Sequence, residues 1–244
     1  AAFMIEEGFP VKQLETIVET MAAEAKKAGV RIIAGDTKVV EKGSIDGVYI
    51  NTTGVGFLPE DRELEPEKME IGDAIIVNGA IGDHGVAILG ARGELGIRPN
   101  INSDCASLNG LIGEVLNGIP GVRIMRDPTR GGLATTLVEI AEDFQVTMEI
   151  EEEAVPVKKE VRGACEILGY DPLYLANEGK VIFIVKKESE NKALEILKQH
   201  ELGKDAAIIG RIAEKGKGRL RLRTGIGSTR PLHRLSGMML PRIC

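Results

Sequence analysis

The C-terminal residue, Cys244, has the side chain with the clearest capacity for covalent chemistry. A thiol becomes a good nucleophile once it is a thiolate, and at the end of a chain it can swing between sites. For Cys244 taken alone, an exposed cysteine without a role is the favoured interpretation. The residues before it, Leu240-Pro241-Arg242-Ile243, have the character of a fixed recognition sequence and favour a functional thiol.

Asp36 and Lys38 follow residues 30–34, which we expect to form a short buried strand. In α/β folds the carboxyl ends of strands carry ligand-binding groups. Asp36 could hold Mg²⁺ on a phosphate, and Lys38 could neutralise a phosphate or assist a proton transfer. The alternative, slightly favoured by the local sequence, is an aspartate that bonds the backbone of its own turn.

Asp83 and His84 lie between Gly82 and Gly85, ahead of an expected helix. A helix N-terminus attracts phosphate or carboxylate groups, so this turn is a candidate ligand site. An aspartate that caps the helix explains Asp83 at least as well. His84 is too isolated in the sequence to be interpreted as a metal ligand.

Residues 127–132 combine the carboxylate of Asp127, the guanidinium of Arg130 and a pair of glycines before another expected helix. Adjacent glycines allow close approach of the backbone to a ligand. Arg130 could grip a phosphate or carboxylate by two hydrogen bonds. A turn with a surface arginine is the alternative, and we favour the functional interpretation. This is not a Walker A loop, which needs G-x-x-x-x-G-K followed by Ser or Thr.

Glu178 lies in the segment Asn177-Glu178-Gly179-Lys180, just before a strand expected at 181–185. A carboxylate fixed there could act as a general base, and a simple polar turn is an equally good explanation. Cys105 and Cys165 fall on apolar faces of expected helices, so both are expected to be buried structural thiols. The absence of any CxxC pair argues against zinc and redox-pair sites.

Hydrophobic periodicity predicts an α/β chain of two domains. Helices are expected at 13–28, after Gly85, at 104–117, after Gly132, from Pro156 through Leu168 and at 191–200. Strands are expected at 30–34, 47–57, 146–150, 181–185, 206–212 and 220–224, and a new α/β region is expected to begin at 73–78. The charged, proline-bracketed stretch 59–70 is interpreted as a linker. Residues 225–244 lack periodicity and are expected to form an extended, mobile tail.

Composition narrows the class of function. The 244 residues carry a net charge of −6, with 3% aromatic residues and no Trp, which argues against a nucleic-acid or anionic-membrane partner. No apolar run reaches a membrane-spanning length. Three cysteines without framework spacing indicate a reducing, cytoplasmic location. The start lacks both an initiator Met and a signal peptide, which suggests a chain that begins inside a longer protein.

Taken together, these segments resemble the HypE carbamoyl dehydratases of nickel–iron hydrogenase maturation, relatives of aminoimidazole ribonucleotide synthetase, selenophosphate synthetase and thiamine-monophosphate kinase. The resemblance spans the chain in order, and its most specific parts are the Asp-Pro-Thr-Arg-Gly-Gly and Pro-Arg-Ile-Cys segments in combination. The matching stretches are 5–10, 35–40, 82–85, 103–106, 127–134, 176–180 and 241–244.

The resemblance implies a two-domain, PurM-like α/β fold of the α+β type, with an incomplete N-terminal domain and a C-terminal mixed sheet flanked by helices. Residues 1–64 would be the remainder of an ATP-binding and dimerisation domain, 65–224 the C-terminal domain and 225–244 the tail. It also implies a homodimer and a carbamoyl group that the carbamoyltransferase HypF places on Cys244. ATP-dependent dehydration would turn this group into a thiocyanate, and the cyano group would pass to iron on a HypC–HypD scaffold.

The resemblance also implies roles for individual residues. Glu178 would be the base that removes the N–H protons, and Lys38 would assist it or balance charge; the same pair could deprotonate Cys244. Asp36 and Asp127 would contact Mg²⁺ or phosphate. The remaining nucleotide contacts would come from Asp83, His84, Arg130 and Asn177.

In the family, considerable sequence precedes the stretch that matches 5–10, and it supplies much of the phosphate site. We therefore expect this chain alone to bind Mg-ATP weakly or not at all, and isothermal titration with micromolar binding would contradict this. Two other functions stay open. One is a related ATP-dependent phosphotransferase acting on a small molecule, which would not need a terminal cysteine. The other is a carrier or docking module without ATPase activity.

Overall fold

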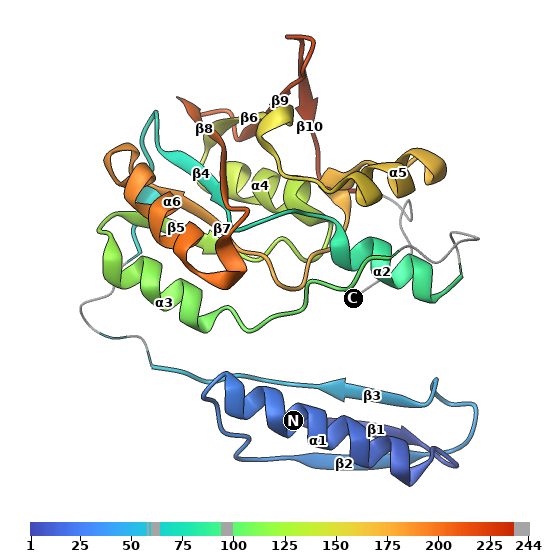
Figure 1. Cartoon of the computed structure of the whole chain (residues 1–244). Coiled ribbons are helices and arrows are strands. Elements are labelled where there is room, and N and C mark those ends of the chain that lie inside the picture. The colour runs from blue at the N-terminus through green and yellow to red at the C-terminus, as the bar shows by residue number, and fades with distance from the viewer. Residues whose placement is uncertain (58, 60–63, 94–99, 237–244) are drawn as a thin grey trace. The chain divides into compact units, whose positions relative to one another are not determined.

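The computed structural model describes residues 1–57, 59, 64–93 and 100–236. The chain divides into two compact units, residues 1–63 and residues 64–244, and each is described by itself (Figure 1). Within the described ranges, no helix is both long and apolar enough to cross a bilayer.

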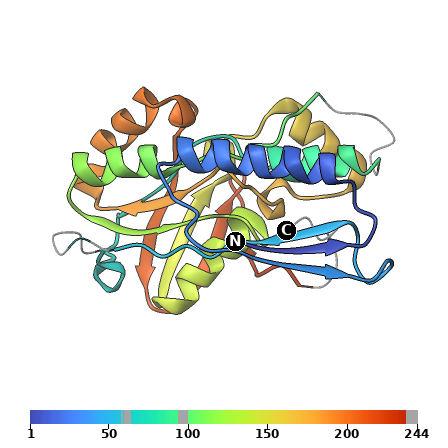
Figure 2. The same ribbon diagram turned by 90° about the horizontal axis from the view of Figure 1, so that it is seen from below.

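The first unit is a three-stranded sheet with one helix. Strands β1 (Ala2–Glu6), β2 (Asp36–Val40) and β3 (Val48–Asn51) are ordered β2-β1-β3, with β2 parallel and β3 antiparallel to β1. Helix α1 (Val11–Lys27) connects the parallel strands and lies over one face of the sheet (Figure 2). It confirms the helix expected at 13–28, and Gly29 follows its end with a positive φ of 69°.

The strand expected at residues 30–34 is wrong. The parallel register pairs Ala2 with Asp36, so residues 30–34 precede the stretch that faces β1, and their large apolar side chains are exposed. Asp36 is therefore the first residue of strand β2, whereas it was predicted to follow the end of a strand. The strand expected at 47–57 is confirmed only over the four residues of β3.

The second unit is built on a seven-stranded mixed sheet in the order β10-β9-β6-β8-β4-β7-β5. Neighbouring strands are antiparallel except β6 and β9, which are parallel. The strands are β4 (Ala74–Val77), β5 (Val122–Arg126), β6 (Val146–Glu151), β7 (Ile182–Val185), β8 (Ala207–Lys215), β9 (Arg219–Arg223) and β10 (Thr229–Leu232).

Helices flank this sheet, which confirms the predicted α/β class. They are α2 (Asp83–Ala91), α3 (Asn109–Gly118), α4 (Gly132–Asp143), α5 (Lys159–Leu168) and α6 (Glu190–Gln199). Short 3-10 helices occur at Pro66–Lys68, Glu152–Ala154, Pro172–Tyr174, Lys187–Ser189 and Glu201–Gly203.

Alternate residues of the central strands enter two different cores. Ile75 and Val77 of β4 belong to the cluster that contains Leu133 and Leu137 of α4. Ala74 and Ile76 of the same strand belong to the cluster formed with α3 and α6, which lie beside each other (Figure 1). Because β4 and β7 are covered on both faces, every residue in them is buried, which explains their continuous apolar sequence.

The C-terminal segment is more ordered than expected. Residues 225–244 were predicted to be an extended, mobile tail, yet Thr229–Leu232 form β10, which pairs antiparallel with β9. The chain then attaches to α4: the Arg234 Nε donates to the Glu142 carboxylate at 2.7 Å, and the Leu235 amide donates to the Thr135 hydroxyl at 3.1 Å. The rest of the predicted tail, 237–244, lies outside the described residues.

Three other expectations need correction. The helix expected at 104–117 begins at Asn109, and Pro156 precedes α5 instead of lying in its first turn. The linker expected at 59–70 is wrong for its last part, because Met69 is 1% exposed and therefore belongs to the core of the second unit. Strand β5 was not predicted at all.

Candidate active site

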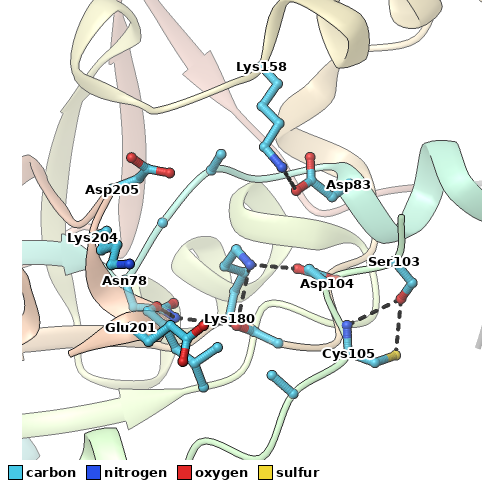
Figure 3. A pocket seen from close by; sticks show the side chains of 15 residues that line it. Asn78, Asp83, Ser103, Asp104, Cys105, Lys158, Lys180, Glu201, Lys204 and Asp205 are labelled. Carbon is cyan, nitrogen blue, oxygen red and sulfur yellow. Dashed lines mark hydrogen bonds and ion pairs between the residues drawn. The ribbon is translucent and has the colours of Figure 1, made fainter. Parts of the chain in front are cut away.

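Three loops of the second unit surround a cavity of about 350 Å³. One follows β4, one precedes α3 and one precedes β7; Lys158 before α5 and residues 201–205 also line the cavity. The Lys158 and Lys180 side chains point toward Asp83 and Asp104 (Figure 3). The polar residues that line the cavity include Asn78, Asp83, Ser103, Asp104, Lys158 and Lys180.

Asp104 fastens the loop before α3 to the loop before β7. Its Oδ1 accepts a hydrogen bond from the Glu178 amide at 3.1 Å, and its Oδ2 lies 3.0 Å from the Lys180 ammonium. A Cβ on Gly179 would overlap the Asp104 carbonyl oxygen, so only glycine permits this close approach. These long-range bonds hold Asp104 outside α3, which is why the helix starts at Asn109.

Asn177 ties together three backbone segments. Its side-chain oxygen accepts from the Gly82 amide at 2.8 Å, and its amide nitrogen donates to the carbonyls of Pro128 at 3.0 Å and Leu175 at 2.9 Å. The residue is fully buried. Asn177 was predicted to bind a nucleotide; its geometry supports a positioning role, with both amide hydrogens engaged by the protein.

The Asp83 carboxylate is buried, and only one of its two oxygens has a hydrogen-bond partner among the described residues. Its Oδ2 accepts a hydrogen bond from the Lys158 ammonium at 2.6 Å, which raises the pKa of Lys158. Its Oδ1 is buried without a hydrogen-bond partner among the described residues. A buried carboxylate oxygen without a donor is costly, so this atom is suited to accept a hydrogen bond from a ligand in the cavity. The N-cap position of α2 belongs to Gly82, so Asp83 is not the cap that the alternative interpretation proposed.

His84 connects the loop before α3 with Glu178. Its Nδ1 lies 2.8 Å from the Ser103 hydroxyl, and its Nε2 lies 3.9 Å from the Glu178 carboxylate. The Ser103 hydroxyl in turn lies 3.1 Å from the Cys105 sulfur. The His84 imidazole is 9% exposed and the Glu178 side chain is 31% exposed. Glu178 is therefore nearer to solvent than His84.

Cys105 is exposed, which corrects the prediction of a buried structural thiol, because its loop is not part of α3. Cys165 is buried in the cluster formed by α2 and α5, as predicted. Burial raises the pKa of the Cys165 thiol to about 11, with Asp171 and Glu166 adding to the shift.

Iodoacetamide at pH 7 is therefore expected to modify Cys105 in the folded protein and to leave Cys165 intact, because only the accessible thiolate reacts. Peptide mapping by mass spectrometry measures each site separately, and unfolding in urea should make Cys165 reactive as the control. Equal modification of both thiols in the folded protein would contradict this assignment.

Asp127 and Arg130 lie beside this site, in the loop that Asn177 holds through the Pro128 carbonyl. Both side chains are exposed. Asp127 accepts a hydrogen bond from the Thr129 hydroxyl at 2.6 Å, whereas Arg130 has no hydrogen-bond or ion-pair partner among the described residues. A Cβ on Gly132 would overlap the carbonyl oxygens of Leu173 and Leu175, so that glycine serves close backbone packing.

Asp36 and Lys38 belong to the first unit and are both exposed. The Asp36 carboxylate accepts a hydrogen bond from the Thr37 amide at 2.8 Å, the local bonding that the alternative interpretation expected. No cluster of three potential metal ligands occurs within the described ranges. Cys244 lies outside these ranges.

The structure thus brings four of the predicted site residues together: Asp83, His84, Asn177 and Glu178. Sequence reasoning missed the groups that position them, namely Asn78, Ser103, Asp104, Lys158 and Lys180. The signals that could have found several of them were the stretches 103–106 and 176–180, which carried the family resemblance.

Comparisons with known proteins agree with this arrangement. Residues 1–58 match the family model described as AIR synthase related protein, N-terminal domain, and residues 70–223 match the corresponding C-terminal domain. The carbamoyl dehydratase HypE of Azotobacter vinelandii is 48% identical over 244 residues, which cover 100% of this chain and 72% of that protein. The chain belongs to the HypE family.

Solved HypE structures share its fold. A HypE crystal structure in complex with ATP is 42% identical and superposes with a TM-score of 0.93, covering 100% of this chain and 74% of that one. HypE in a crystal structure of the HypE–HypF complex is 48% identical with a TM-score of 0.91. The match covers 96% of this chain and 76% of that one. The PurM-like fold predicted from the sequence is therefore confirmed.

Proposed function

We propose that this protein is the ATP-dependent dehydratase of an S-carbamoyl group carried on its own Cys244, which it converts to a thiocyanate. The observation that carries the proposal is the placement of Glu178. Asp104, which lines the cavity, accepts a hydrogen bond from the Glu178 amide at 3.1 Å, and the Glu178 carboxylate is partly exposed, as a general base requires. Membership of the HypE family supports this placement, since relatives are named carbamoyl dehydratases.

The chemistry needs an activated oxygen and a base. A carbamoyl oxygen is a poor leaving group, so transfer of a phosphoryl group from ATP must precede its departure. Glu178 would remove the N–H protons, while Lys38 would balance charge or assist the transfer. Arg130 is the best-placed phosphate contact, because its guanidinium is exposed and unpaired beside the N-terminus of α4.

Of the remaining nucleotide contacts expected from the sequence, Asp83 and Arg130 keep that role here. His84 lies between Ser103 and Glu178 and is not assigned to the nucleotide. Asp83 offers the ligand its unpartnered Oδ1, and Asn177 acts by holding the loops that surround the site. No cluster of three potential metal ligands occurs among the described residues. Asp36 and Asp127 would contact Mg²⁺ only together with phosphate oxygens or water.

Partners follow from the same proposal, in a cytoplasmic setting. HypF, which forms a complex with a relative, would supply the carbamoyl group, and a HypC–HypD scaffold would accept the cyano group on iron. A homodimer would form through the first unit. Among the described residues of that unit only Ile5 is a buried hydrophobic side chain, whereas Val18, Val39 and Ile50 are exposed, as expected of a surface that a second copy covers.

Intact-mass spectrometry tests the proposal directly. After incubation with the carbamoyl donor system, the protein should gain a carbamoyl group. Addition of ATP, at a concentration high enough to offset the weak binding expected of this chain, should then remove one water from the adduct. A small-molecule phosphotransferase would show no such adduct. A carrier without ATPase activity would gain the carbamoyl group and keep it unchanged when ATP is added.

A further inference from the structure

The proposed dehydration must remove two protons from a single nitrogen. In the first half, the carbamoyl oxygen bonds to the γ-phosphorus of ATP, the bond from that phosphorus to ADP breaks, and one N–H proton leaves. In the second half, the C–O bond breaks and the oxygen departs with phosphate. The second N–H proton leaves as the third carbon–nitrogen bond forms, which gives the thiocyanate.

One carboxylate can hold only one of these protons. Glu178 must therefore release the first proton before it accepts the second. Its side chain is 31% exposed, so water can receive that proton, and a neighbouring base that receives it directly provides a second route. Lys38 is a poor receiver, because a lysine is already protonated near neutral pH and its ammonium has no acceptor atom. The group on this second route has to be a neutral base within reach of the Glu178 carboxylate.

We propose that His84 is this group, and that it relays protons from Glu178 through Ser103 to the cavity beside Cys105. This inference rests on the proposed function. The imidazole places one nitrogen 3.9 Å from the Glu178 oxygen and the other 2.8 Å from the Ser103 hydroxyl. A neutral imidazole carries one donor and one acceptor nitrogen, so it can accept a proton on one side and give one up on the other.

The surroundings of His84 favour this direction of transfer. Of the acidic groups around it, Asp83 on its own helix is paired with Lys158, and Asp104 on the facing loop is paired with Lys180. Glu178 is left as the carboxylate that faces the imidazole, at 3.9 Å. The 3.9 Å separation exceeds a hydrogen bond, so a water or a small rotation of the half-exposed Glu178 side chain completes the path.

His84 acts through Glu178 and is a positioning residue for the base, so its test needs a readout that a purely structural role would leave unchanged. In protein already loaded with the carbamoyl group, His84→Gln is expected to slow the ATP-dependent loss of water by about 10- to 100-fold. Carbamoyl loading and the KM for ATP should be unchanged. The pH–rate profile should change shape between roughly pH 5 and 8. In His84→Ala, which leaves room for the ring, added imidazole should restore part of the rate.

His233→Gln is the matched control, because His233 is exposed and only its backbone oxygen is engaged, by the Tyr174 hydroxyl. Ser103→Ala provides a second variant at an exposed position, should His84→Gln fail to fold by circular dichroism. Ser103→Ala should also slow the ATP-dependent loss of water, because it removes the hydroxyl group that would receive the proton from His84.

The outcomes separate the two proposals. If the wild-type protein takes up the carbamoyl group but loses no water with ATP, the proposed function itself fails. If the wild type dehydrates, and folded His84→Gln or Ser103→Ala does so at the wild-type rate with the wild-type pH profile, the relay is wrong. Reduced rates without rescue by imidazole and without a change in the pH profile would likewise reject the relay in favour of a structural histidine.

Discussion

Replacing Cys244 by alanine is expected to abolish carbamoyl loading completely. The carbamoyl group needs a thiolate to accept it, and the proposed function assigns that role to Cys244 and to no other thiol. Cys165 is buried with a raised pKa, which makes it inert. Intact-mass spectrometry after incubation with the carbamoyl donor system measures the adduct directly.

The matched control is Cys165→Ala, which removes a thiol and keeps the terminal one. It should load to the same extent as the wild type, provided that circular dichroism shows a folded protein. An adduct that persists on Cys244→Ala, and that peptide mapping locates on Cys105, would overturn the carrier role of the C-terminal residue while leaving the fold assignment intact.

The substitution Glu178→Gln should leave loading intact and slow the loss of water by about 10²- to 10⁴-fold, the range typical of a missing general base. Glutamine keeps the size of the side chain, and the backbone bond from residue 178 to Asp104 does not depend on the carboxylate. The change therefore isolates the proton transfer. Single-turnover kinetics on carbamoylated protein, followed by intact mass, give the rate.

Glu166→Gln is a suitable control, because Glu166 is an exposed carboxylate on α5 and takes no part in the contacts of Glu178 with Asp104 and His84. Combining Glu178→Gln with His84→Gln adds a further check. If the two residues act as one unit, the double variant should be scarcely slower than Glu178→Gln alone, because effects within such a unit are not additive. A wild-type rate in Glu178→Gln would require another base.

Elements whose pattern is local could be predicted well. The helix expected after Gly132, with apolar residues at Leu137 and Ile140, is confirmed as α4, and both residues are buried in the core. The run 181–185 was predicted to be a strand because its sequence is continuously apolar. The structure explains this composition, since β7 is buried on both faces of the sheet. Such signals depend on residues a few positions apart.

Features that depend on distant partners could not be predicted in the same way. The apolar spacing from Leu108 onward predicted a helix that began at residue 104, but the loop before α3 is held by Glu178 and Lys180, more than seventy positions away. The exposure of Cys105 follows from that contact. Likewise the strand at Asp36–Val40 is set by its register with β1, and nothing between 30 and 40 specifies where pairing begins.

The buried charge of Arg123 is another feature that could not be predicted from the sequence, because it depends on a distant partner. Arg123 on β5 is 2% exposed and bonds the buried Asp73 at 2.9 Å, with Glu65 and Glu70 nearby. A sequence gives no reason to place an arginine in the interior, because the compensating carboxylate lies fifty positions earlier. Of the candidate site, the acid–base residues were accessible to sequence reasoning, whereas their mutual distances required the fold.

The attachment of the C-terminal segment to α4 limits the reach of the carrier thiol. Beyond Leu235, whose amide bonds Thr135, the remaining chain spans about 30 Å at full extension, since each residue adds at most 3.3–3.6 Å. Whatever path it takes, the sulfur stays within a sphere of that radius, where tethering gives it an effective concentration on the order of millimolar. A donor enzyme must therefore bring its own catalytic centre inside this sphere, so docking geometry, in addition to thiol reactivity, selects which enzyme can load the carrier.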